Sequence, residues 1–341
     1  MKKKLNVLML FDCEISKERG YDYKEEFRGE DCRIYNDIYL ALKNNGHDVR
    51  LLGIRDNIRP LLDEVDENRP DVVFNVADVF SSKTSLDKNI AWLLEMLGLV
   101  YTGGNPANLS LCNNKALSKK ILSFHKIKVP NFHSFYRKRP IKRSKKRMDL
   151  PMIVKPLCEE ASRGISLASV IDTDAALKER VLFIHENMRM DAIGEEYIEG
   201  REFYVSILGN KRIEALPIRE MKFGRISDEE SRIATYKAKW DNKYREKWGI
   251  KNVFAGRLPG DWEEKIISVS KRAYRALNLD GYARFDVRVT PEGEVYVIEV
   301  NLNPSLERED EFERSANKAG MSFDELIQKL ITLAIDARAE K

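Results

Sequence analysis

The most informative stretch of the sequence is YARFDVRVTPEGEVYVIEVN, residues 282–301 of 341. Apolar and polar residues alternate along it on both sides of Glu292-Gly293, which predicts a β-hairpin with one buried face. The first strand divides into an apolar set and a polar set, which are Phe285, Val287 and Val289 and Arg284, Asp286 and Arg288. The returning strand carries Glu299 and Asn301 two residues apart, and therefore on one face.

A turn at Glu292-Gly293 brings two carboxylates together. In that register Asp286 lies across from Glu299, and Arg284 lies across from Asn301. Like charges directly opposed on a sheet destabilise the strand pairing. A hard divalent cation removes the conflict, because Mg2+ accepts carboxylate and amide oxygens. We therefore predict a metal site at Asp286, Glu299 and Asn301. The alternative is a solvent-facing polar strand without a function.

Lysines and a loop of small residues are candidates for binding phosphate. A predicted strand, MIVKP, ends in Lys155, and the loop that follows contains Ser162 and Gly164. A lysine neutralises phosphate charge, and such a loop can present backbone N–H groups to the same oxygens. Lys115 is a further candidate. For both lysines the alternative is a solvated surface side chain.

The segment EEYIEGRE, residues 195–202, is unusually dense in carboxylates for a strand. Adenine needs backbone donors and acceptors at its edge, and a ribose needs a carboxylate for its hydroxyls. This segment contains both kinds of group. The alternative is a charged edge strand that is kept soluble by repulsion.

The length of the chain predicts two or three domains. Residues 1–112 alternate short apolar strands with helical patterns, which predicts a small parallel sheet covered on both faces, as in a Rossmann-like domain. No G-x-G-x-x-G follows its first strand, so a nicotinamide cofactor is not expected there. Further along, the pattern predicts helices at Leu109–His125, Thr173–Glu186, 262–278 and Ser322–Ala339, and a strand at 195–208 that Gly200 interrupts.

The composition of the sequence excludes several kinds of site and segment. The four cysteines form no C-x-x-C pair and the four histidines are scattered, so neither a zinc site nor a disulfide framework is expected. No apolar run approaches the length that crosses a bilayer. We therefore predict a cytoplasmic protein that does not associate with membranes through a spanning segment.

The formal net charge is +4, and basic residues gather at Arg137–Arg147, RKRPIKRSKKR. This basic segment could dock an acidic protein, RNA or a membrane surface, or it could be a solvated hairpin tip. It lacks an aromatic residue for base stacking, so nucleic acid is not an expected partner.

The order of these motifs resembles the ATP-grasp superfamily, and more closely its D-alanine–D-alanine ligase branch. The resemblance also includes VFNVAD at 73–78, VYTGG at 100–104 and YKAKW at 236–240, which is similar to the branch's mobile loop over the phosphates. It covers roughly residues 70–335. It implies a Rossmann-like domain at 1–112, followed by two α+β lobes at 113–197 and 198–341 that enclose ATP.

The resemblance also implies a role for each matching residue. The proposed ATP ligands are Lys115 and Lys155 with Ser162 and Gly164 for the phosphates, Glu195, Tyr197 and Ile198 for adenine, and Glu202 for the ribose. Lys239 would reach the γ-phosphate when its loop closes. Arg284 would stabilise the tetrahedral intermediate, because an arginine keeps its proton and is a fixed donor.

The resemblance weakens on the substrate side. The branch's Gly-Gly-x-Ser-x-Glu loop is replaced by Phe11-Asp12-Cys13-Glu14 and a charged insertion, which leaves Glu14 and Glu30 as alternatives for its carboxylate. The metal asparagine is followed by Pro304-Ser305-Leu306-Glu307, where Ser305 is a candidate substrate residue, and by an acidic run at 307–311. An acidic acceptor site repels a carboxylate and favours a basic or amine-rich acceptor.

We therefore predict an ATP- and Mg2+-dependent carboxylate–amine ligase, with Mn2+ as a substitute metal, that is not a true D-alanine–D-alanine ligase. Its substrates would be amino acids or small peptides, activated as acyl phosphates, and the resemblance implies a homodimer. One alternative is the same chemistry on a macromolecule docked by residues 137–147. Another is a non-catalytic ATP-binding module, which would not need Arg284.

Overall fold

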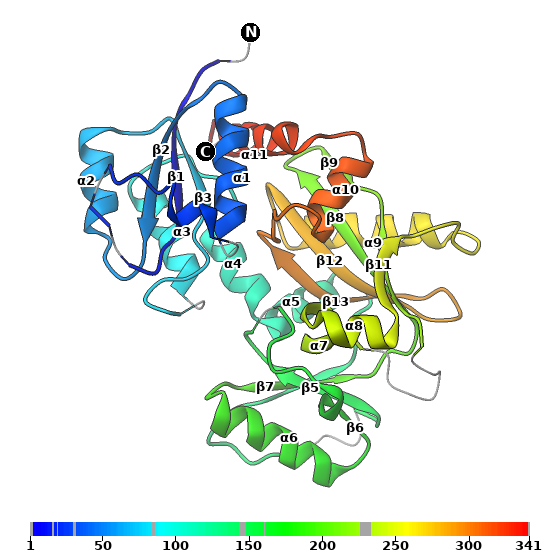
Figure 1. The fold of residues 1–341 in the computed structure, drawn as a ribbon. Helices are drawn as coiled ribbons and strands as arrows, with labels where there is room; N and C mark the ends of the chain where they lie inside the picture. Colours follow the sequence, from blue (N-terminus) through cyan, green and yellow to red (C-terminus); the bar gives the residue numbers. More distant parts are fainter. Residues whose placement is uncertain are drawn as a thin grey trace.

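The computed structural model describes residues 3–15, 17–18, 20–29, 32–83, 86–142, 148–159, 161–225 and 233–339. Within these residues the strands form three sheets (Figure 1). Their orders are β2-β1-β3, β4-β7-β5-β6 and β11-β10-β8-β12-β13, with β9 paired to β8. None of the described helices is both long and apolar enough to span a bilayer.

The N-terminal sheet is parallel, as the alternation of strands and helices predicts. Its elements are β1 (Asn6–Asp12), β2 (Asp48–Ile54) and β3 (Val72–Val76), with α1 (Arg33–Asn44), α2 (Arg59–Glu67) and α3 (Asp87–Met96) around them. Strand β1 is buried on both faces, which explains its continuous apolar sequence. Leu8 and Leu10 pack in one core cluster with residues of α2 and α3, whereas Val7 and Met9 pack in another with residues of α1.

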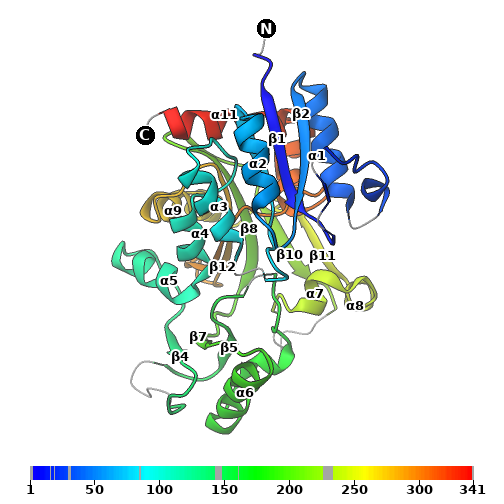
Figure 2. The same cartoon turned by 90° about the vertical axis from the view of Figure 1, so that its left-hand side faces the viewer.

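The second sheet is small and lies apart from the other two (Figure 2). Its elements are β4 (Phe132–Phe135), β5 (Met152–Pro156), β6 (Val170–Ile171), β7 (Ala192–Glu196) and α6 (Asp174–Asn187). Two helices, α4 (Pro106–Asn113) and α5 (Lys115–Phe124), lead into it. The prediction of one helix across 109–125 is wrong, because the Asn114 side chain caps α5 by accepting hydrogen bonds from Ala116 and Leu117. Lys115 is therefore the first residue of a helix.

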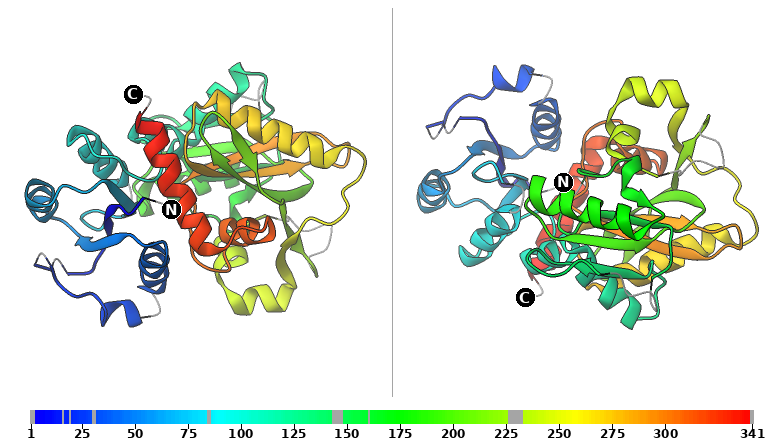
Figure 3. Two further views of the ribbon diagram at one scale, coloured as in Figure 1. Left: turned by 90° about the horizontal axis from the view of Figure 1, so that it is seen from above. Right: turned by 90° about the horizontal axis from the view of Figure 1, so that it is seen from below.

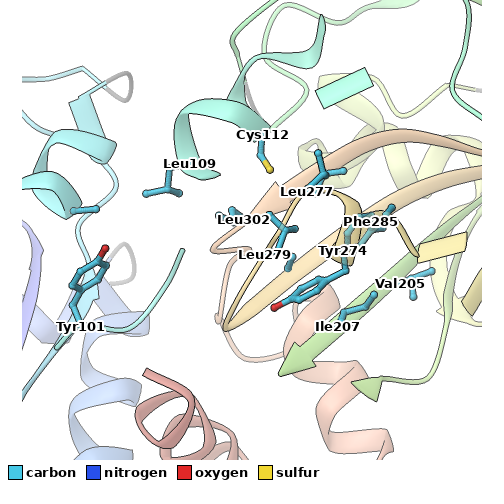
Figure 4. Packing of buried hydrophobic residues seen from close by; sticks show 14 of the residues in the cluster. Tyr101, Leu109, Cys112, Val205, Ile207, Tyr274, Leu277, Leu279, Phe285 and Leu302 are labelled. Carbon is cyan, nitrogen blue, oxygen red and sulfur yellow. The ribbon is translucent and has the colours of Figure 1, made fainter. Parts of the chain in front are cut away.

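The third sheet contains the hairpin. Its elements are β8 (Arg201–Gly209), β9 (Ile213–Ala215), β10 (Arg219–Phe223), β11 (Ile250–Phe254), β12 (Tyr282–Val289) and β13 (Val295–Leu302), with α7 (Tyr236–Trp240), α8 (Asn242–Trp248), α9 (Trp262–Ala276) and α10 (Glu311–Lys318). Phe285 packs against Tyr274 of α9 with 6.3 Å between ring centroids (Figure 4). The predicted apolar face of the hairpin is thus the core face.

The register of the hairpin is the predicted one from Ala283 to Asp286 and differs from it by one residue between Val287 and the turn. Asp286 pairs with Glu299, and Arg284 pairs with Asn301. Beyond Asp286 the register shifts, so that Val287 pairs with Val297 and Ile298 is the extra residue of a β-bulge. On the other edge of β12, Arg284 pairs with Ser206 of β8.

The last helix, α11 (Phe323–Ala339), returns to the beginning of the chain. It packs against α1 and β3 and lies between the N-terminal unit and the third sheet (Figure 3). Ile327 is fully buried in the core cluster that contains Met9 and Ile38. The division at 1–112, 113–197 and 198–341 stays a prediction, but the N-terminal core is built partly from this helix.

Shortening one side chain of α11 should weaken the N-terminal core. Ile327→Ala removes buried methyl and methylene groups, and such a cavity costs about 2–5 kcal/mol in the free energy of unfolding. Urea unfolding of the variant measures this loss. Lys329→Ala, at an exposed position of the same helix, is the control. Equal stability of the two variants would contradict the packing described here.

Candidate active site

A cleft of about 560 Å³ lies between the second sheet and the polar face of the hairpin. Nine predicted site residues line it, namely Lys155, Ser162, Glu195, Tyr197, Ile198, Glu202, Lys239, Asp286 and Glu299. Residues far apart in the sequence, from both sheets and from α7, thus meet at one surface.

Buried opposite charges form one wall of this cleft. Glu195 of β7 forms an ion pair with Lys119 at 3.1 Å through one carboxylate oxygen and with Lys155 at 3.0 Å through the other. All three side chains are almost completely buried. Lys119 also donates to the backbone carbonyl of Ile298. Sequence reasoning missed Lys119, although it follows Lys115 by four residues and so lies on the same helical face.

The pKa values of this cluster follow from burial and pairing. Burial lowers the pKa of Lys119 to about 8, against the opposing effect of Glu195. Burial alone would raise the pKa of Glu195, but Lys119 and Lys155 outweigh it and hold that pKa below the ordinary value. Both groups are therefore charged near neutral pH, and the wall has a net positive charge.

Replacing Lys119 with methionine should move acid unfolding to a higher pH. In the wild type, the low pKa of Glu195 contributes stability that is fully present above the ordinary glutamate pKa and is lost as pH falls through the lower folded value. With one ammonium group removed, the pKa of Glu195 should rise toward its ordinary value. Urea unfolding measured from neutral to acidic pH tests this shift.

The control for that experiment is Lys120→Met, at an exposed position on the same helix. It removes the same charge from the chain without touching Glu195. If the two variants lose stability over the same pH range, Lys119 does not set the ionisation of Glu195.

The two opposed carboxylates of the hairpin have different partners. Glu299 pairs with Lys115 at 2.9 Å, and Lys115 also donates to the carbonyl of Glu159. Burial opposes ionisation of Glu299, but Lys115, Lys155 and Lys239 outweigh it and hold the pKa of Glu299 well below its usual range. Glu299 is therefore ionised at neutral pH.

Asp286 lies at the centre of a second group of cations. Arg284 binds it in a bidentate manner, at 2.7 and 3.2 Å, and Lys239 of α7 approaches it at 3.5 Å. The Asn301 amide donates to the same carboxylate at 3.2 Å. The hairpin thus gathers two carboxylates and an amide on one face, and the carboxylate charges are balanced by side chains from α5, α7 and β12.

Another ion pair that lines the cleft is formed by Arg288 and Glu202. Arg288 binds Glu202 at 3.2 Å, donates to the Ile198 carbonyl at 2.7 Å and lies 5.4 Å from the centre of the Tyr197 ring. Sequence reasoning placed Arg288 on the polar face without assigning it a role. This arginine therefore orients the Ile198 backbone, which the resemblance assigns to adenine, and the Glu202 carboxylate, which it assigns to the ribose.

The apolar lining of the cleft was also missed. Apart from Ile198, which was predicted, it consists of Pro130, Ile153, Ile165, Ile233, Ala234 and Ile298. Ile298 reaches the cleft because it is the extra residue of the bulge. A strict two-residue alternation places it on the opposite face from Glu299, so the prediction missed it, although the apolar positions change phase between Val297 and Val300.

The predicted phosphate loop is held by contacts from both lobes. Arg180 of α6 donates to the Gly164 carbonyl and to the Ser169 hydroxyl, the latter at 3.0 Å. From the other side, the Trp240 indole donates to the Ala161 carbonyl at 3.0 Å. Gly164 has φ +72°, and a Cβ there would meet Met188 at 2.7 Å, so only glycine fits. Helix α7 is thus docked on this loop.

A second cavity of about 910 Å³ shares Lys239 with the cleft. Its wall includes Arg284, Asn301 and Ser305 among the predicted residues, together with Asp78, Tyr204, Trp240, Asn252, Asp310 and Glu311. Arg284 and Asn301 therefore face this second cavity, and Asp286 lies in the wall between the two.

The predictions near the N-terminus have mixed outcomes. Glu14 lines a cavity beside Asp12, whose carboxylate accepts hydrogen bonds from the backbone of Asp78 and Val79. Burial raises the pKa of Asp12 to about 6. Glu30 lies outside the described residues, as do residues 143–147 of the basic segment. At the near end of that segment Arg137 donates from its backbone to Asp191.

Known proteins resemble this chain over most of its length. The chain is 28% identical over 310 residues to the uncharacterised protein y4sG of Sinorhizobium fredii, covering 89% of this chain and 87% of that one. It is 28% identical over 309 residues to the D-alanine–D-alanine ligase of Carboxydothermus hydrogenoformans, covering 88% and 92%.

The fold has solved counterparts. The D-alanine–D-alanine ligase of Bacillus anthracis, solved with ATP, superposes with a TM-score of 0.74 at 21% identity, over 98% of this chain and 99% of that one. This likeness confirms the ATP-grasp fold. The family model described as D-ala D-ala ligase C-terminus matches residues 121–332, more than half of the chain. The chain therefore belongs to the D-alanine–D-alanine ligase C-terminus family.

Proposed function

We propose that the chain is an ATP- and Mg2+-dependent ligase that joins a carboxylate to an amine through an acyl phosphate. The observation that carries the proposal is the opposition of Asp286 and Glu299 in a cleft lined by buried lysines. Phosphoryl transfer is catalysed mainly by positioning and by neutralising charge. The lysines and carboxylates that line this cleft can do both. Membership of the ligase family supports the same chemistry.

ATP would lie along the cleft, with its base at the Arg288 end. The adenine ligands are Glu195 and the backbone near Tyr197 and Ile198, the ribose ligand is Glu202, and the phosphate ligands are Lys115, Lys155, Ser162, Gly164 and Lys239. Lys239 is carried by α7, which is docked on the phosphate loop, so closure of α7 excludes water from the phosphates.

The donors at the hairpin fit a hard cation. Asp286, Glu299 and Asn301 would hold Mg2+, with Mn2+ as a substitute, because carboxylate and amide oxygens are their usual ligands. The part of the chain that the structure describes contains no group of three or more His, Cys, Asp or Glu side chains that could hold a metal alone. Water and phosphate oxygens would therefore complete the coordination. The bound ion would neutralise charge on the terminal phosphates.

The reaction would proceed in two displacements. The donor carboxylate attacks the γ-phosphorus of ATP, and the bond to ADP breaks. The amine then attacks the acyl carbon, loses a proton, and displaces phosphate. Arg284 is a fixed, permanently charged donor next to both cavities, so it would stabilise the oxyanion of the second step.

The substrates would be small amino acids or peptides, and the acidic acceptor side argues against D-alanine as the preferred acceptor. Incubation with ATP, Mg2+ and panels of amino acids, dipeptides and amines tests this, with phosphate release and product mass measured together. Amine-dependent ADP formation supports the ligase. Efficient D-alanyl-D-alanine synthesis would contradict the substrate proposal.

The same assay separates the alternatives. Turnover only with a protein or RNA acceptor would favour a macromolecular substrate docked by residues 137–147. Tight ATP binding without turnover under any condition would favour a non-catalytic module.

A further inference from the structure

Helix α7 carries Lys239, but with five residues it is too short to hold its own position. It lies between the second and third sheets (Figure 1) and depends on contacts to both sides. On one side, Ala238 is buried in a core cluster with Tyr204 of the third sheet. On the other, the Tyr236 backbone donates to the Ile165 carbonyl at 3.0 Å. The position of Lys239 is therefore set by what surrounds the helix.

Arg245 of α8 holds the C-terminal end of α7. Two of its nitrogens donate to different acceptors, one to the Ala238 carbonyl and the other to Asn252 Oδ1 at 3.1 Å. The last carbonyls of a helix have no partner within it, and an arginine side chain can supply the missing donor. Because Ala238 directly precedes Lys239 in the chain, this contact fixes the backbone from which the lysine extends.

Asn252 of β11 is in turn held by a buried ion pair. Its amide nitrogen donates to Glu311 Oε1 at 2.6 Å, so both ends of the amide have a partner. Arg219 of β10 binds the same carboxylate at 3.0 and 3.4 Å and donates to the Asn252 carbonyl at 3.0 Å. Both Arg219 and Glu311 are buried. Strands β10 and β11 and helix α10 thus support Arg245 from behind.

This hydrogen-bond network connects the two cavities. Asn252 and Glu311 line the second cavity, and Lys239 lines both the second cavity and the cleft. Arg245 lines neither of them, so it does not touch a ligand in either place. Its contacts are with the residue before Lys239 and with the wall of the second cavity.

We infer that Arg245 is a positioning residue for Lys239. By joining the Ala238 carbonyl to Asn252, it places the Lys239 ammonium group for its contact with the γ-phosphate of ATP. The inference rests on that contact, which is part of the proposed function. A displacement of about 1 Å that originates far from the reacting atoms can cost roughly a hundredfold in rate, so a residue outside both cavities matters to the reaction.

The preference for a nucleoside triphosphate over the diphosphate measures the γ-phosphate contact without requiring turnover. Calorimetry with ADP and with a non-hydrolysable ATP analogue, each with Mg2+, gives this preference for every variant. Lys239→Met should reduce it about tenfold, the usual effect of losing one charge-assisted contact. Arg245→Met should reproduce most of that loss, although it leaves Lys239 in the chain.

A double variant separates positioning from a general loss of stability. If Arg245 acts through Lys239, Arg245→Met should have no further effect on the preference in a Lys239→Met background, because both changes remove the same contact. Arg245→Lys can reach only one of the two acceptors, so its preference should be intermediate. Lys243→Met, at an exposed position of the same helix, is the matched control and should behave as the wild type. If Arg245→Met does not fold, Arg245→Lys takes its place in the same comparisons.

The outcomes distinguish a failure of this inference from a failure of the proposed function. If Lys239→Met lowers the preference and Arg245→Met does not, or if their losses add in the double variant, the phosphate contact stands and the positioning role is wrong. If Lys239→Met has no effect, the phosphate contact and this inference both fail. If the preferences change as expected but no carboxylate is ligated to any amine, Arg245 still positions Lys239 and only the ligase proposal fails.

Discussion

Arg284→Ala should lower amine-dependent product formation roughly a hundredfold to a thousandfold, the usual loss when one oxyanion donor is removed. Affinity for ATP should change little, because Arg284 lines the second cavity and not the cleft proposed to hold ATP. Asp286 keeps Lys239 and Asn301 as partners in the variant. Single-turnover product formation and calorimetric ATP binding measure the two effects separately.

Two further variants sharpen this test. Arg284→Lys keeps the charge but cannot reproduce the bidentate contact with Asp286, so we expect an intermediate rate. Arg275→Ala, at an exposed position of α9, should behave as the wild type. Full activity of Arg284→Ala would remove this arginine from the mechanism, and a parallel loss of ATP affinity would mean that it supports the nucleotide instead.

Glu299→Gln should reduce turnover by at least about a hundredfold and shift the Mg2+ titration to higher concentration, because an amide is a much weaker ligand for a hard cation than a carboxylate. The variant also removes the buried carboxylate with which Lys115 forms an ion pair. The fraction of Mn2+ bound in the presence of nucleotide, measured by electron paramagnetic resonance, reports metal binding without relying on activity.

The matched control is Glu294→Gln, at an exposed position just before β13, where the glutamate pairs with Lys128 at the surface. It should retain wild-type turnover and metal binding. Unchanged Mn2+ binding by Glu299→Gln would show that the hairpin carboxylates serve only to balance the lysines.

The hairpin register could be predicted from the sequence because it depends on local information. Alternation and a Gly-containing turn fix which residues face each other, and Asp286 and Glu299 are opposed as expected. The bulge was missed, because its one signal is a change in the phase of the apolar positions between Val297 and Val300. Ile298 therefore entered the cleft unpredicted.

Residues that depend on tertiary packing were harder to find. Lys119 resembles its neighbour Lys120 in sequence, yet the fold buries the first against Glu195 and exposes the second. Arg288 was placed on the correct face, but its contact with the Ile198 carbonyl requires β8 to lie beside β12. Helices α2 and α10 were also missed, because both are short, at nine and eight residues, and charged residues dominate their sequences.

The position of α11 has a consequence for how the protein is made. Translation delivers β1 well before α11, yet Val7, Met9 and Phe74 of the N-terminal sheet share a cluster with Leu326, Ile327 and Leu330. While a ribosome is still synthesising the second and third sheets, that face of the N-terminal sheet lacks part of its cover. The sheet therefore completes its core only after α11 has emerged and cannot finish folding as soon as its own strands are made.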